Sequence, residues 1–111
     1  MLVAGRKDFT TNTFSGVMIG DLSKNDISSL TGIYGFRDGE NTYAFKEDGT
    51  AFIGGSGSGR IEFNGSEGII ESSNYSQGNK GMSINLAEGT IFANDFTLIA
   101  NNKLFITSEE Y

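Results

Sequence analysis

Acidic side chains are the groups in this sequence that could carry out a reaction. Two carboxylates that flank a glycosidic bond are enough to hydrolyse it, one as acid and the other as base or nucleophile. The candidates are Glu62, Glu71, Glu88 and Asp95. Their spacing does not fix any two of them at the required separation, and charges on the solvent side of strands are the ordinary interpretation. We therefore expect no catalytic residue and no enzymatic activity.

Other reactive chemistry is limited by the residue types that are missing. The 111 residues include no His and no Cys, so neither a Ser-His-Asp nor a Cys-His nucleophile can be assembled. The usual nitrogen and sulfur ligands of zinc are missing as well. Gly54 and Gly59 have the spacing of a phosphate-binding loop, but Arg60 and Ile61 stand where Lys and Ser or Thr are required. The acidic turns at 38–41 and 47–48 lack the spacing of a calcium loop. No cofactor or metal site is predicted, and a bound surface cation stays open.

Three tyrosines are candidate contacts for a glycan: Tyr34, Tyr43 and Tyr75. A tyrosine ring is apolar on its face and polar at its tip, which suits stacking on a sugar. Packing at strand ends is the competing interpretation, and we favour it.

Composition narrows the class of protein and of partner. The net charge of −6 argues against nucleic acid, because phosphate binding needs clustered Lys and Arg. No apolar run approaches the ~20 residues of a membrane span. The length fits one domain, but 16 of its residues are Gly, which bury little apolar surface. A single copy therefore has a thin core and gains stability if other copies cover its apolar faces.

A short repeat indicates how the chain is organised. Residues 48–52 and 88–92 both read acid, Gly, Thr, small or aliphatic residue, Phe. The acid and Gly supply a turn, because Gly reaches positive φ without steric cost. The Thr then returns the chain to the extended region, where β-branched residues are favoured. Each repeat is therefore expected to close one strand and open the next.

The region 33–111 is predicted to be a repetitive β-strand region. Apolar residues alternate with polar ones, and turn signals recur every eight to twelve residues. Asn64-Gly65 is the strongest hairpin signal, while 54–59 and 72–80 read as loops. The pairs Phe96/Leu98 and Leu104/Ile106 are expected to continue the alternation. Because the chain has no Pro, every residue can donate to a neighbouring strand. The pattern predicts an all-β fold, either a small sandwich or an intertwined oligomer.

The first 32 residues form a mixed N-terminal region with the one helix signal of the chain, at about residues 23–31. Ser23 and Asp26 make a capping box, and Leu22 and Ile27 occupy hydrophobic-staple positions. A polar turn with two buried aliphatic residues is an equally good interpretation.

The run from Tyr43 to Ile106 resembles tail fibre and baseplate-associated structural proteins of phages or prophages of Gram-positive bacteria. The resembling segments are AFKEDGTAFIG at 44–54, GRIEFNG at 59–65, KGMSINLAEGTI at 80–91 and NDFTL at 94–98. The order of these segments carries the resemblance, and residues 1–32 do not contribute to it.

The resemblance implies a virion structural segment that is made in the bacterial cytoplasm and contributes to host attachment. It implies an elongated homotrimeric rod, of a β-helix or β-prism type, in contact with other tail or baseplate proteins. It is also consistent with a piece of a longer tail protein. A module that binds cell-wall glycan, or a non-catalytic part of a glycan-degrading tail enzyme, is the alternative.

The alternation also supplies candidates for the core that copies would share. They are Ile61, Phe63, Ile84, Leu86, Ile91, Phe96, Leu98, Leu104 and Ile106. A threefold axis would let one face of each chain meet two copies of itself. Alternation alone does not separate two copies from three.

Overall fold

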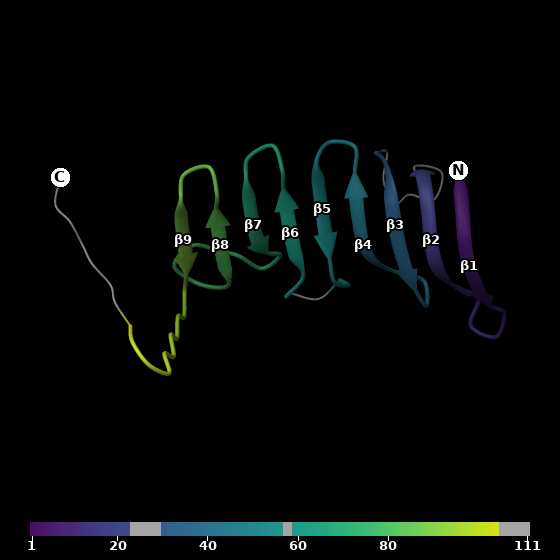
Figure 1. Cartoon of the computed structure of the whole chain (residues 1–111). Coiled ribbons are helices and arrows are strands. Elements are labelled where there is room, and N and C mark those ends of the chain that lie inside the picture. Colours follow the sequence, from purple (N-terminus) through teal and green to yellow (C-terminus); the bar gives the residue numbers. More distant parts are fainter. Residues whose placement is uncertain (23–29, 57–58, 105–111) are drawn as a thin grey trace.

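One antiparallel sheet makes up the computed structural model, which describes residues 1–22, 30–56 and 59–104 (Figure 1). Its nine strands lie in chain order, so each strand pairs only with its neighbours in the sequence. The strands are β1 (Leu2–Asp8), β2 (Thr13–Asp21), β3 (Thr31–Arg37), β4 (Glu40–Lys46), β5 (Thr50–Ile53), β6 (Ile61–Asn64), β7 (Ile69–Ser72), β8 (Met82–Asn85) and β9 (Thr90–Ala93). The molecule measures 60 × 29 × 26 Å. The predicted all-β class is confirmed, with a single elongated and open sheet in place of a sandwich.

Both copies of the acid-Gly-Thr repeat form the predicted turns. Gly49 and Gly89 have φ of 83° and 71°, and Thr50 and Thr90 are the first residues of β5 and β9. In the first copy the carboxylate of Asp48 accepts hydrogen bonds from the Thr50 N–H (3.0 Å) and hydroxyl (2.6 Å). The repeat therefore fixes where a strand begins.

The predicted hairpin at Asn64-Gly65 is present, with a connection of residues 65–68 between β6 and β7. The Asn64 side-chain oxygen accepts a hydrogen bond from the Glu67 N–H at 3.2 Å. Asn85 does the same for the Glu88 N–H at 3.0 Å, before β9. The two hairpins thus share a second repeat, Asn-x-x-Glu-Gly, which was not predicted from the sequence.

The buried core is small and lies on one face of the sheet, over β2 to β5. It consists of Leu22, Tyr34, Phe36, Ala44 and Phe52, with Phe14 and Met18 packed against it. The rings of Phe14 and Phe36 meet edge to face, with their centroids 6.0 Å apart. Tyr34 is completely buried, and its hydroxyl donates a 2.6 Å hydrogen bond to the Leu30 carbonyl. The core therefore depends on the connection between β2 and β3, to which Leu22 and Leu30 belong.

The mixed N-terminal region contributes two strands to the same sheet. Residue 32, at the end of that region, lies inside β3. Most of the predicted helix at about 23–31 lies outside the described residues. Leu30 is a bend and Thr31 opens β3, so no helix extends to residue 31.

The prediction of strands beyond β9 is wrong for the described residues up to 104. Phe96, Leu98 and Leu104 lie in irregular chain, and Ile106 lies outside the described residues. Asn94 explains this: its side-chain amide nitrogen donates to the carbonyl oxygens of Ser76 (3.2 Å), Lys80 (2.6 Å) and Gly81 (3.0 Å). These bonds hold the chain against the loop between β7 and β8 at the point where β9 ends.

Candidate interaction surfaces

The strand register places one apolar residue of every strand in a single line across the sheet. In order from β1 to β9 these are Leu2, Ile19, Ile33, Phe45, Ala51, Phe63, Ile70, Ile84 and Ile91, and each lies directly opposite the next. Paired residues on neighbouring strands point to the same face of a sheet. We call this line the apolar ladder and its side of the sheet the ladder face.

A second line of uncharged residues runs beside the ladder on the same face, because side chains two positions apart share a face. It comprises Ala4, Val17, Gly35, Tyr43, Ile53, Ile61 and Ser72, followed by the pair Met82 and Ala93. A Cβ on Gly35 would overlap the ring of Tyr43, so the tyrosine ring packs against that glycine. We call this line the second row.

Much of the ladder face is open to solvent. Leu2, Ile19, Ile33, Phe45, Ile53, Ile61, Met82 and Ile91 are each more than a third exposed. With roughly 180 Å² for a fully exposed residue of this size, they leave on the order of 700 Å² of surface open. The largest apolar patch of a typical monomer is about 300–600 Å². The ladder face is therefore larger than a monomeric protein ordinarily leaves uncovered.

Most of the predicted oligomer core lies on or beside the ladder face. Ile61, Phe63, Ile84 and Ile91 belong to the two lines of residues defined above. Leu86 borders a cavity with Phe63 and Ile70, and Phe96 borders one with Ile91 and Ala93. Leu98 and Leu104 are exposed in the irregular chain after β9.

The N-terminal half of the ladder was not predicted from the sequence. Leu2, Ile19, Ile33 and Phe45 were not among the predicted core residues, although they continue the same line. The run Val17-Met18-Ile19 hides the alternation there, because Met18 packs against the buried core on the opposite face. The signal was the spacing of Val17 and Ile19, which share the ladder face.

The opposite face changes character along the sheet. One line runs Val3, Met18, Tyr34, Ala44, Phe52, Glu62, Glu71 and Ser83. It is apolar as far as Phe52, polar at Glu62, Glu71 and Ser83, and ends in β9 on Phe92, which lies opposite Ser83, whereas the ladder stays apolar over all nine strands. The two faces are therefore distinct surfaces with different possible partners.

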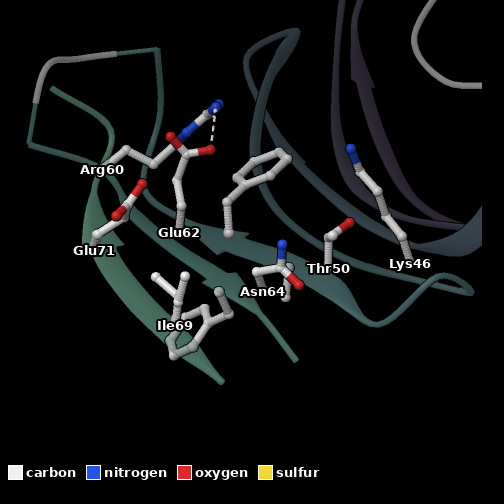
Figure 2. Close-up of a pocket in the computed structure, with 10 residues that line it drawn as sticks. Lys46, Thr50, Arg60, Glu62, Asn64, Ile69 and Glu71 are labelled. Carbon is white, nitrogen blue, oxygen red and sulfur yellow. Dashed lines mark hydrogen bonds and ion pairs between the residues drawn. The ribbon is translucent and has the colours of Figure 1, made fainter. Parts of the chain in front are cut away.

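A polar pocket of about 270 Å³ lies where the opposite face changes (Figure 2). Its lining includes Lys46, Phe52, Arg60, Glu62, Asn64 and Glu71. The Arg60 guanidinium carbon lies 4.2 Å from the centre of the Phe52 ring, and the Lys46 ammonium nitrogen lies 5.6 Å from it. The Arg60 head group also contacts the Glu62 carboxylate at 3.5 Å. Two cations thus flank one aromatic ring at the pocket.

The pocket brings together two of the four carboxylates considered for hydrolysis. Glu62 lies directly opposite Glu71, while Glu88 and Asp95 lie in the turn before β9 and the chain after it. Glu71 accepts a 2.9 Å hydrogen bond from the hydroxyl of Ser83. The pair supplies hydrogen-bond acceptors to a polar ligand. Among the described residues no three acidic side chains gather as a metal site would require.

The three candidate tyrosines do not form one platform. Tyr34 is completely buried, so its ring offers no face to a sugar, and it is withdrawn as a glycan contact. Tyr43 lies in the second row of the ladder face, on the other side of the sheet from Tyr34. Tyr75 is half-buried in the loop after β7. Tyr43 and Tyr75 stay predictions.

The pKa values of two carboxylates, those of Glu40 and Asp48, are lowered by the hydrogen bonds that these groups accept. The pKa of Glu40 is lowered, first by the backbone N–H of Ser56 (2.8 Å) and then by its hydroxyl (3.0 Å). The pKa of Asp48 is lowered, chiefly by the hydroxyl of Thr50. Asp48 thereby stabilises its own turn, whereas Glu40, the first residue of β4, holds the loop after β5 at Ser56.

Comparisons with protein-family models, with curated proteins and with solved structures gave no match. In the part of the chain that the structure describes, no helix is long and apolar enough to cross a membrane.

Proposed function

We propose that this chain is a structural segment of a phage or prophage tail fibre or baseplate protein that contributes to host attachment. It carries out no catalysis, assembles as a homotrimer and contacts other tail or baseplate proteins in the virion. The resemblance of residues 43–106 to such proteins of phages of Gram-positive bacteria suggested this role.

The observation that supports the proposal is the continuous apolar ladder on an elongated open sheet. A nine-stranded meander with little core of its own gains most from copies that cover its exposed face. Such an assembly is a stiff rod, which is what a tail device needs between the virion and the cell surface.

Light scattering on the purified chain at micromolar concentration tests the proposal. We expect three times the mass of the 111-residue chain and, by small-angle scattering, an elongated particle. A stable monomer would remove the physical basis for the fibre function. A melting temperature that rises with protein concentration would support assembly independently, because association stabilises the folded state by mass action.

The polar pocket supports a second candidate function, binding of bacterial cell-wall glycan. Glu62, Glu71 and Asn64 offer polar groups to sugar hydroxyls beside the cations Lys46 and Arg60. A glycan array with the parent chain and the Glu71→Ala variant tests this candidate. Binding that is lost in the variant, with the strand signal in circular dichroism intact, would support it, and no binding by the parent chain would refute it.

A further inference from the structure

We infer that the apolar ladder lies along the axis of the homotrimer. All three chains run parallel, so each ladder residue faces the same residue of the other two copies. This inference rests on the proposed homotrimer and specifies which surface forms the contact and in which register. The polar pocket then lies on the outside of the assembly, because it belongs to the opposite face of the sheet.

The size of the ladder face supports a second copy as its occupant. The exposed apolar side chains leave on the order of 700 Å² open, close to the roughly 800 Å² that each partner buries in a standard interface. The face extends without interruption from β1 to β9. A small ligand would leave most of it uncovered, whereas another copy of the same length would cover all of it.

The width of the sheet favours three copies. Stacked sheets pack about 10 Å apart, so each wall of a prism lies about 5 Å from the axis. A triangle of that size has sides of about 17 Å, which about five residues span at about 3.4 Å each. Strands β5 to β9 have four residues each. Strands β1 to β4 are longer, with seven to nine residues each. The β5–β9 part of three such sheets therefore closes a prism whose interior is filled by their two inward rows.

The residues along the ladder are compatible with parallel chains. In a threefold assembly every residue near the axis meets its own equivalents, so a charge there would be repelled by two like charges. Neither the ladder nor the second row contains a charged residue. Ala51 lies between Phe45 and Phe63. In the trimer the three copies of Ala51 lie side by side. They therefore leave room for the rings of Phe45 and Phe63 on the neighbouring strands, as interdigitated packing requires.

Cysteine cross-linking tests the inference directly, because the chain has no Cys of its own. The variants Ile91→Cys and Thr90→Cys alter neighbouring exposed positions of β9 that point to opposite faces. We expect Ile91→Cys to form disulfide dimers under mild oxidation in at most two-thirds of the chains, because three thiols on an axis leave one unpaired. Thr90→Cys should give no disulfide within the assembly.

The direction of the chains needs a second pair of variants. In an antiparallel pair centred on Ala51, Ile33 would face Ile70, whereas in the parallel assembly each faces itself. A mixture of Ile33→Cys and Ile70→Cys chains, assembled together, oxidised and digested, should give 33–33 and 70–70 links by mass spectrometry. Links between 33 and 70 would overturn the parallel register.

These outcomes separate the inference from the proposed function. A trimeric mass with links at position 90 and none at 91 would overturn the ladder as the axis while leaving the homotrimer in place. A monomeric mass would overturn both. Because Ile91 is 62% exposed in the single chain, its replacement by Cys leaves the fold of that chain unchanged, and circular dichroism checks this.

Discussion

A lysine at Ile91 gives the sharpest test of whether the ladder face is covered in solution. In the single chain Ile91 is 62% exposed, so Ile91→Lys should cost a monomer no more than about 0.5 kcal/mol, as is usual for surface changes. In an assembly about 110 Å² of each Ile91 becomes buried, which stabilises it by about 3 kcal/mol per copy at 25 cal/mol/Å². Three equivalent copies lose about 8 kcal/mol, before the cost of desolvating three ammonium groups.

Only part of buried area appears as affinity. We therefore expect Ile91→Lys to weaken assembly at least about a thousandfold, equivalent to about 4 kcal/mol. The control is Thr90→Lys, the same charge at an exposed neighbouring position on the opposite face. Light scattering over a dilution series should show the control as trimer and Ile91→Lys as monomer. Equal assembly of the two variants would refute the reasoning, and so would a parent chain that is already monomeric.

Three further predictions concern the fold itself. Gly35→Ala should lower the free energy of unfolding by about 1–3 kcal/mol, as overpacking does, because its Cβ would overlap the Tyr43 ring. In thermal melts the double variant with Tyr43→Ala should recover this loss. A double variant that does not recover it would show that the overlap with Tyr43 is not the cause. In thermal melts from pH 2.5 to 6, Asp48→Asn should lose less stability below about pH 4 than the parent chain loses. The lowered pKa of Asp48 adds stability that is present above the unfolded pKa and lost as pH falls through the folded one, so an unchanged profile would contradict it. Tyr34→Phe should lower the free energy of unfolding by about 1 kcal/mol, because the hydroxyl hydrogen bond is lost. Tyr34→Ala should lower it by about 3–5 kcal/mol, because the ring is lost as well. Equal losses for the two variants in denaturant titration would show that ring packing is unimportant.

The strand pattern from β3 to β9 could be predicted from the sequence because the turns there carry their own chemistry. Asp48-Gly49 and Asn64-Gly65 adopt turns for reasons local to a few residues. Alternation between the turns then assigns residues such as Phe63 and Ile84 to one face.

What could not be predicted depends on neighbours that are distant in the sequence. Phe96 and Leu98 alternate as strand residues do, but no periodicity reveals that Asn94 bonds to the loop before β8. Tyr34 and Tyr43 are alike in type and context. One is buried because Leu22 belongs to the core on its face of the sheet, and the sequence alone does not say which face is covered.

The strict chain order of the strands has a consequence for how such a molecule changes length. Consecutive strands are neighbours throughout the sheet, so a hairpin can be inserted or deleted without rerouting the rest of the chain. Each added hairpin extends the sheet by two strand spacings, about 10 Å, and leaves its cross-section unchanged. Duplication of a segment such as residues 65–85, which holds β7, β8 and the connections before them, would therefore lengthen the molecule by one fixed step.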